Sequence, residues 1–280
     1  MVSHKTSRFH INLQGPVRYM KTIQDDIEKL TDTYDRVVDS GLRDKELGMY
    51  FLSESLAGET YDIGRQIAFA PGWLENQSIW MHMSYKYYLQ ILRGKLYDQF
   101  FSEMRGADMK HGGILPFMDP VVYGRPLMEC SSFIASSAFP DPDYHGRGFL
   151  ARLSGSTAEF MDMWKHMFIG PSPFFLDDNG DLAMQLVPAL PSWLFSDETS
   201  DADPIFDDEG NYIVSFKLFA EIPVTYHNPG GENLYGVPPS SYKVTMADGS
   251  IVDVDGSSIP AETAEKIRRV SPVESIDAYF

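Results

Sequence analysis

The first half of the chain carries hydrophobic residues at helical spacing. Between Val17 and Val38 they recur at steps of three and four, which places them on one face of a helix. Gly41 follows as a typical stop signal. We therefore predict one amphipathic helix over residues 17–38. Its apolar face consists of Val17, Met20, Ile23, Ile27, Leu30, Tyr34, Val37 and Val38.

Three further segments of the first part are apolar enough to form buried helices. Residues 79–92 and 96–104 are rich in large aliphatic and aromatic side chains, and residues 157–168 repeat the pattern. Residues 109–152 between them are rich in Gly, Pro and Ser. An irregular segment of that length is uncommon in a compact domain unless it serves a site.

The hydrophobic period changes to two in the last third of the chain. Residues 216–226 alternate between apolar and polar side chains, which predicts a half-buried strand. Residues 242–246 and 251–254 flank an Asp-Gly pair, which predicts a hairpin. The acidic run over residues 197–209 is typical of a solvated loop.

The change of period divides the chain into a helical part, residues 1–172, and a β-rich part, residues 173–280. Hydrophobic residues make up 43% of the 280 residues, enough to bury a core. The formal net charge of -17 argues against nucleic acid or an anionic membrane surface as a partner. An anionic ligand would therefore need a local positive pocket.

The chain carries no sign of export, membrane insertion or a disulfide framework. Its first residues lead into no apolar signal-peptide core, and no apolar run is long enough for a membrane span. The single cysteine, Cys130, excludes an internal disulfide and a Cys-rich metal site. We expect a cytoplasmic protein without a metal or organic cofactor.

Residues 71–82 combine the side-chain types that carbohydrate sites use. Trp73 and Trp80 offer flat apolar faces for a pyranose ring, while Glu75 and Asn76 offer groups that bind hydroxyls, and His82 follows. The spacing by itself favours the alternative, with tryptophans in a core and a Glu-Asn pair that opens a helix.

Residues 145–159 form a second candidate site, which ends at a predicted helix start. Free backbone N–H groups and the helix dipole favour an anion there, and His145, Arg147 and Arg152 are the nearby residues that could make charge-assisted contacts. A capping box of Ser156 and Glu159 explains part of the pattern without a ligand.

Local motifs of several other enzyme classes are absent from the sequence. It contains no serine-hydrolase elbow, phosphate-binding P-loop, zincin pair or dinucleotide fingerprint. Residues 177–181 resemble a calcium loop but lack the EF-hand spacing and its distal Glu, which favours a turn.

Two ordered motifs resemble glycoside hydrolase family 94, the cellobiose and chitobiose phosphorylases and their relatives. Residues 75–82, Glu-Asn-Gln-Ser-Ile-Trp-Met-His, resemble that family's Glu-Asn-Gly-Gly-Ile-Phe-Cys-His stretch. Residues 152–158, Arg-Leu-Ser-Gly-Ser-Thr-Ala, resemble its Leu-Thr-Gly-Ser-Ala stretch. The resemblance spans roughly residues 60 to 230. It implies a mainly α fold with a β-rich C-terminal part: the last helices of an (α/α)6 barrel, then a small β-sandwich domain.

The resemblance also implies roles for particular residues. It assigns inorganic phosphate to His82, Ser154 and Gly155, with Arg152 beside them, and an acceptor sugar to Glu75, Asn76 and Trp80. Ser154 replaces the family's Thr and keeps its hydroxyl. Gln77, Ser78 and Trp80 depart from the family pattern, which leaves the acceptor open and is compatible with a branch that acts on oligoglucans.

The function implied is phosphorolysis of a β-glucoside with inversion, which yields a sugar 1-phosphate. Phosphate replaces the water-activating carboxylate of an inverting hydrolase, so one general acid remains. The family's acid is an Asp upstream of both motifs, and no residue here has its context. The expected partners are a β-linked gluco-oligosaccharide, phosphate, and the missing N-terminal portion or a second copy of the chain.

Two alternatives remain open at this point. One is a non-catalytic carbohydrate- or partner-binding remnant, and the other is a segment of a related β-glucan transglycosylase. Phosphorolysis alone needs His82, Arg152 and Ser154 as a set.

Overall fold

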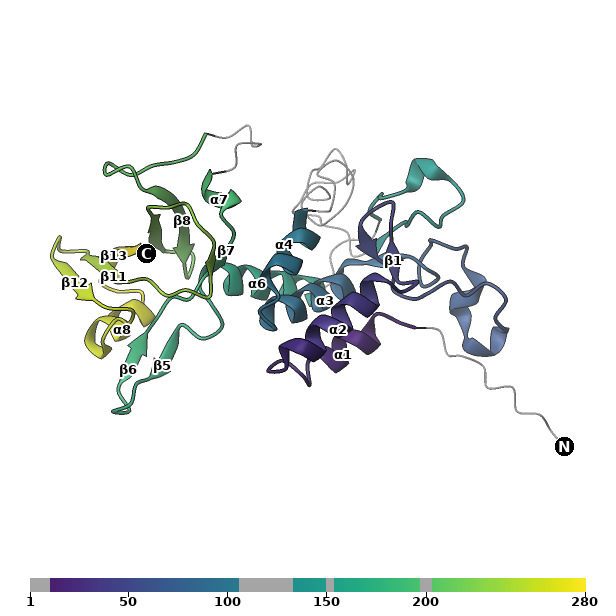
Figure 1. The fold of residues 1–280 in the computed structure, drawn as a ribbon, viewed down its shortest axis with the longest axis horizontal. Helices are drawn as coiled ribbons and strands as arrows, with labels where there is room; N and C mark the ends of the chain where they lie inside the picture. Colours follow the sequence, from purple (N-terminus) through teal and green to yellow (C-terminus); the bar gives the residue numbers. More distant parts are fainter. Residues whose placement is uncertain (1–10, 106–132, 150–153, 197–202) are drawn as a thin grey trace. The chain divides into compact units, whose positions relative to one another are not determined.

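A computed structural model of the chain shows two compact units, residues 1–163 and 164–280. The boundary lies within helix α6 (Ser154–Phe168), whereas the sequence predicts one after residue 172. None of the described helices is long and apolar enough to cross a membrane. The structure describes residues 11–105, 133–149, 154–196 and 203–280 (Figure 1).

Helices α1 to α4 build the core of the first unit. Helix α1 packs against α2 and α3, and α3 packs against α4 (Figure 1). Met20, Leu30, Tyr87 and Phe100 are fully buried between them. The predictions of helices over residues 79–92 and 96–104 are confirmed. The bounds are α1 Gln14–Met20, α2 Ile27–Val38, α3 Met81–Arg93 and α4 Tyr97–Arg105.

The prediction of one continuous helix over residues 17–38 is wrong, because the chain turns between α1 and α2. The Asp26 side chain caps α2 and accepts a hydrogen bond from the Lys29 backbone N–H at 3.1 Å. Thr22 donates from its hydroxyl to the Tyr19 carbonyl at 2.8 Å, just after α1 ends. These side-chain hydrogen bonds satisfy backbone groups that the ends of α1 and α2 leave free. Such polar contacts are not visible in the spacing of apolar residues, so that spacing did not predict the break.

Short strands and 3-10 turns connect the helices of the first unit. Strand β1 pairs with β2, and β3 pairs with β4, each pair antiparallel. An isolated bridge from Phe51 to Ile79 joins the two pairs. The bounds are β1 Arg43–Asp44, β2 Met49–Tyr50, β3 Ile79–Trp80, β4 Phe133–Ile134, η1 Tyr61–Ile63, η2 Arg65–Ala68 and η5 Pro142–Tyr144.

A mixed five-stranded sheet organises the second unit. Its strand order is β12-β11-β13-β9-β8, with β13 and β9 parallel and the other neighbours antiparallel. Two small sheets, β5–β6 and β7–β10, and helices α7 and α8 complete the unit. The bounds are β5 Phe174–Leu176, β6 Leu182–Met184, β7 Ala189–Leu190, α7 Trp193–Ser196, β8 Tyr212–Leu218, β9 Ile222–Asn228, β10 Leu234–Tyr235, β11 Ser241–Met246, β12 Ile251–Asp255, α8 Ala261–Arg268 and β13 Val273–Tyr279.

One face of the five-stranded sheet forms a core and the other is polar. Val224, Val244 and Ile276 are buried on the first face. Thr225 and Asp277 point to the opposite face, as the alternation of side chains along a strand requires. This pattern is what one buried face and one solvated face produce in a sheet.

The hairpin predicted around Asp248-Gly249 is confirmed as β11 and β12. The single strand predicted over residues 216–226 is wrong, since a tight turn divides it into β8 and β9. Phe219 and Ala220 occupy that turn with φ of 53° and 62°. Hairpin turns with positive φ usually carry Gly or Asn, so no turn signal marks this one in the sequence.

The predicted fold class is also wrong. The first unit mixes its helices with short two-stranded sheets, and the described helices do not close into the ring of helix pairs that an (α/α)6 barrel requires. The second unit has one large mixed sheet rather than the two facing sheets of a β-sandwich. Amphipathic periodicity predicts which face of a helix is buried, but it does not specify what lies against that face.

Candidate functional site

The junction of β3 and α3 carries the residues that most resemble a binding site. Strand β3 pairs with β4, and the chain enters α3 directly from Trp80, whose backbone is extended. Within the part of the chain that the structure describes, no side chain caps this helix start. The first N–H groups of α3 therefore rely on solvent or a ligand as a hydrogen-bond partner.

His82 lies in the first turn of α3 and is half-buried. Its Nδ1 atom is shielded from solvent and has no hydrogen-bond partner among the described residues. Burial lowers the pKa of the His82 imidazole below its ordinary value of 6.5, and the Lys86 ammonium lowers it further. A neutral imidazole beside an uncapped helix start can donate to an anion or accept its proton.

Trp80 packs beside this histidine. The two rings meet edge to face with centroids 5.5 Å apart, and the indole also contacts Phe133 of β4 at 5.6 Å. The indole N–H donates to the Leu74 carbonyl at 2.7 Å. Trp80 thus fixes the loop before β3 and forms one wall beside His82, with its polar atom already engaged.

Glu75 forms a forked ion pair with Arg65 of η2. The guanidinium donates to the two carboxylate oxygens at 2.5 and 3.1 Å. The hydrogen bond from Arg65 lowers the pKa of the Glu75 carboxyl below its usual value. The pair is largely exposed, so its remaining donors and acceptors stay accessible to a polar ligand.

Asn76 is buried and mainly supports the loop. Its side-chain amide nitrogen donates to the Phe69 backbone carbonyl at 2.7 Å, and its backbone carbonyl accepts from the Gly72 N–H at 2.8 Å. The Oδ1 atom is buried without a hydrogen-bond partner among the described residues. Asn76 and Glu75, although adjacent in sequence, therefore have different surroundings.

The second predicted motif is described only in part. Ser154 and Gly155 form the start of α6, and the backbone there is helical. Arg152 lies outside the described residues, as do residues 109–132 and Cys130. The prediction of a helix over residues 157–168 is confirmed, with its start three residues earlier than expected.

Helices α3 and α6 run side by side in the same direction within the first unit. The Tyr85 and Phe160 rings are 5.3 Å apart, and Arg93 forms an ion pair with Asp162 at 2.5 Å. From the Tyr85–Phe160 contact, Arg93 and Asp162 lie about 9 Å apart along the axes if the helices are parallel and about 15 Å apart if they are antiparallel, so the ion pair favours the parallel arrangement. The starts of the two helices therefore lie at the same end, where both dipoles are positive.

Both ring nitrogens of His145 have hydrogen-bond partners within the protein. Its Nδ1 lies 2.9 Å from the Glu46 carboxylate and its Nε2 lies 2.8 Å from the Phe139 carbonyl. Burial alone would lower the pKa of His145, but these two hydrogen bonds outweigh burial and raise the pKa. Both ring nitrogens are thus engaged within the protein, which leaves neither of them for an anion.

A buried carboxylate in the first unit was not evident from the sequence. Glu103 of α4 is 1% exposed, and its Oε1 atom accepts hydrogen bonds from Arg43, Tyr34 and Tyr50 at 2.7 to 2.8 Å. Glu103 occupies an apolar position of its helix, which is the one signal that could have revealed it. Among the described residues, no three His, Cys, Asp or Glu side chains gather as metal ligands.

No model of a known protein family matches the chain, and no curated protein matches it.

Proposed function

We propose that this chain holds phosphate and sugar in an inverting glycoside phosphorylase that cleaves a β-glucoside and yields a sugar 1-phosphate. The observation that carries the proposal is the half-buried imidazole of His82 in the first turn of α3, whose Nδ1 has no hydrogen-bond partner among the described residues. The chemistry of this site is independent of the barrel fold expected from the sequence.

Phosphate is the ligand that this helix start suits best. The N–H groups of the first turn point toward the helix end, and the dipole favours a negative charge there. The parallel α6, which begins with Ser154 and Gly155, adds a second helix start at the same end. In an acidic chain, two such ends supply positive potential without an excess of Lys and Arg.

The sugar-binding part of the proposal relies on the loop before α3. Trp80 offers a half-buried ring beside His82, and the exposed Glu75–Arg65 pair offers hydrogen bonds to hydroxyls. Asn76 contributes by holding the loop in shape rather than by a free amide group. A pyranose placed here would lie next to the proposed phosphate position.

Phosphorolysis requires a general acid in addition to these groups, and such an acid needs a raised pKa. The carboxyl groups with shifted pKa values in the described residues are shifted downward instead, so none of them suits this role. The proposal therefore places the acid in the portion of the enzyme that carries the family's catalytic Asp. The five lowered groups are Asp26, Glu75, Asp207, Asp248 and Glu262.

Phosphate binding by this chain is the first test. In a titration with inorganic phosphate followed by ³¹P NMR, His82→Asn should weaken binding about tenfold, the value of one charge-assisted hydrogen bond. Lys45→Gln, which removes an exposed positive charge elsewhere in the first unit, should leave the affinity within about twofold. Equal losses in both variants would reduce the effect to general electrostatics and contradict the proposal.

Catalysis is tested in a polypeptide that also contains the portion with the catalytic Asp. The expected result is phosphate-dependent release of glucose 1-phosphate from β-linked disaccharides. Equal cleavage or transfer without phosphate would favour a hydrolase or transglycosylase. Sugar binding without phosphate binding would favour the non-catalytic alternative.

A further inference from the structure

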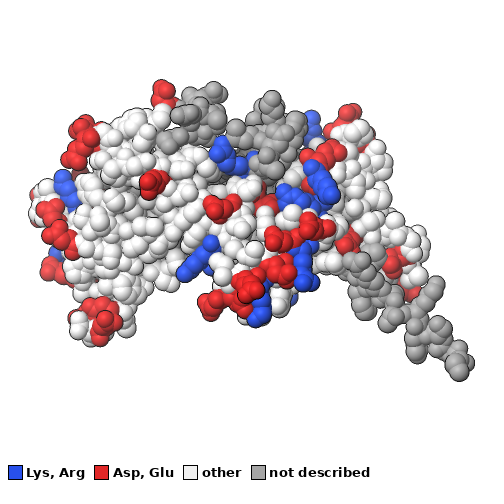
Figure 2. Space-filling view, viewed as in Figure 1, with Lys and Arg blue, Asp and Glu red and all other residues white. Residues whose placement is uncertain are grey.

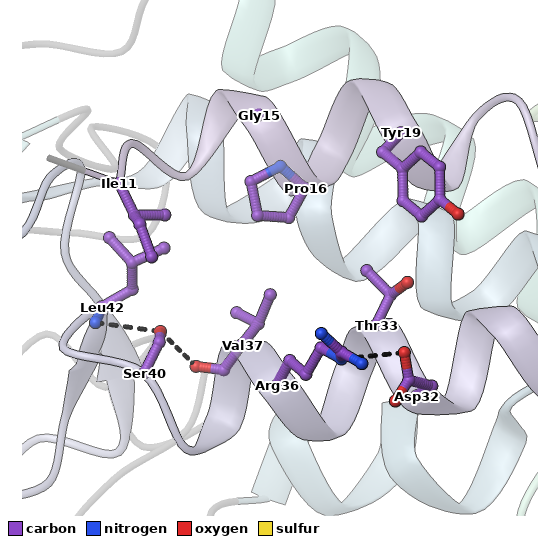
Figure 3. Close-up of a pocket in the computed structure, with 10 residues that line it drawn as sticks. All are labelled: Ile11, Gly15, Pro16, Tyr19, Asp32, Thr33, Arg36, Val37, Ser40 and Leu42. Atoms are coloured by element: carbon purple, nitrogen blue, oxygen red, sulfur yellow. Dashed lines mark hydrogen bonds and ion pairs between the residues drawn. The ribbon is translucent and has the colours of Figure 1, made fainter. Parts of the chain in front are cut away.

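A groove of about 460 Å³ lies between α1 and α2 in the first unit. Figure 3 shows Pro16 and Tyr19 of α1 on one side and Arg36 and Val37 of α2 on the other, with open space between them. The volume falls within the range of small-molecule sites. The lining residues are Ile11, Gly15, Pro16, Tyr19, Asp32, Thr33, Arg36, Val37, Ser40 and Leu42.

The groove has an apolar floor with one accessible aromatic ring. Val37 and Leu42 are buried at its base, with exposed fractions of 4% and 0%. Tyr19 is 50% exposed and makes no ring contact with any other described aromatic residue. Together with Pro16 the Tyr19 ring offers a flat apolar surface with a phenolic hydroxyl at its edge.

The charged groups of the groove cancel each other. Arg36 Nε lies 2.9 Å from Asp32 Oδ2, and both side chains are well exposed. Figure 2 shows acidic and basic side chains beside one another in this part of the surface, with the acidic ones gathered along its lower edge. The groove therefore selects neither an anion nor a cation, while the pair keeps free donors on the guanidinium and a free carboxylate oxygen.

The hydroxyls of Thr33 and Ser40, which line the groove, are already engaged. Thr33 donates to the Lys29 carbonyl, and Ser40 donates to the Val37 carbonyl, each at 2.7 Å. The Arg36–Asp32 pair and the Tyr19 hydroxyl thus carry the polar recognition. A purely apolar ligand would desolvate the ion pair without replacing its hydrogen bonds, which is unfavourable.

We propose that this groove binds a neutral oligosaccharide, with one pyranose ring stacked on Tyr19 and its hydroxyls hydrogen-bonded to Asp32 and Arg36. Such a ligand has apolar ring faces for the aromatic side chain and a hydroxyl periphery for a neutral donor-acceptor pair. The site consists of residues other than those proposed to hold phosphate and goes beyond that function. It would anchor a sugar chain away from the reacting bond.

The test uses the complete chain and cellopentaose as the probe, with binding measured by isothermal titration calorimetry. Tyr19→Ala should weaken binding about tenfold through loss of stacking, and Asp32→Asn should weaken it as well. Tyr61→Ala is the matched control, because Tyr61 is 79% exposed in η1 and lies outside the groove. It should bind like the unmodified chain.

Several results would overturn the proposal. These are no binding of cellopentaose, equal loss in the Tyr19 and Tyr61 variants, or unchanged affinity in Tyr19→Ala. Thermal unfolding of each variant shows whether the fold is intact, and ¹H–¹⁵N spectra locate the perturbed residues independently of affinity. The His82→Asn variant separates the two sites, since it should lose phosphate affinity and retain the Tyr19-dependent binding.

Discussion

Arg43 donates a hydrogen bond to Glu103 at 2.7 Å in the interior of the first unit. The Glu103 side chain is 1% exposed, and that of Arg43 is 17% exposed. The hydroxyls of Tyr34 and Tyr50 donate to the same carboxylate oxygen. This cluster ties α4 to α2 and to the strands β1 and β2, which fixes the scaffold on which α3 and the candidate site rest.

We expect Glu103→Ala to destabilise the chain by about 3–5 kcal/mol, because it leaves the Arg43 guanidinium without its carboxylate and the Tyr34 and Tyr50 hydroxyls without their acceptor. The free energy of unfolding in urea measures this loss. The control is Glu75→Ala, which breaks the exposed pair with Arg65 and should cost at most about 1 kcal/mol. Similar losses in both variants would contradict a special role for the buried pair.

Stability should depend on the protonation of His82. Its folded-state pKa lies below the unfolded value of about 6.5, so the unfolded chain binds a proton more readily between the two pKa values. The contribution is fully present above pH 6.5 and is lost as the pH falls through the lower folded-state pKa. Urea unfolding at a series of pH values measures how the free energy of unfolding falls on the acid side. His82→Asn should remove the part of this fall that comes from His82, and an unchanged pH dependence would contradict a lowered pKa at His82.

The second unit holds a histidine between two carboxylates. His227 Nδ1 lies 2.6 Å from Asp207 and its Nε2 lies 2.9 Å from Asp277, while its ring stacks on Tyr279 at 4.4 Å. Both ring nitrogens of His227 thus face carboxylate oxygens. This residue attaches the loop before β8 to the polar face of the sheet.

We expect the acid sensitivity of the second unit to depend on Asp207. Burial alone would raise the pKa of its carboxyl, but hydrogen bonds from Asn211 and His227 outweigh burial and lower the pKa below 3.8. The stability it provides is present above pH 3.8 and is lost as the pH falls through the folded-state pKa. Asp207→Asn should make the stability of the second unit less dependent on acid pH, followed through the His227 ring signals in NMR. Asp208→Asn, which changes an exposed neighbour, should leave the pH dependence unchanged.

Gly72 should tolerate no side chain. Its φ is 79°, and a Cβ atom there would lie 2.2 Å from the Phe139 backbone nitrogen. Gly58 has a similar φ of 85° with open space around it, so Gly58→Ala reports the cost of the backbone conformation alone, about 1 kcal/mol.

Gly72→Ala should destabilise the chain by more than Gly58→Ala does. It should also weaken phosphate binding, because it moves the loop that carries Glu75 and Trp80. Urea unfolding and the ³¹P NMR titration measure the two effects. Equal destabilisation of the Gly72→Ala and Gly58→Ala variants would contradict the prediction, since it would mean that the Phe139 backbone moves aside without a free-energy cost.

The sequence by itself determined the helices α3, α4 and α6 and the hairpin of β11 and β12. Each of these depends on a local signal: a run of apolar side chains, a helix start, or an Asp-Gly turn. The sequence also brought together Glu75, Trp80 and His82, because they are close neighbours in one loop and the helix start that follows. Proximity along the chain guarantees proximity in space at that range.

Only the tertiary structure decided how these elements assemble. The break before α2 and the turn at Phe219 are stabilised by hydrogen bonds and backbone conformations that leave no periodic signal. The polar residues Glu103 and His145 are buried or engaged by partners distant in sequence. A mixed sheet and the parallel arrangement of α3 and α6 are contacts between remote segments, and one chain's hydrophobic pattern specifies which faces are buried but not which faces meet.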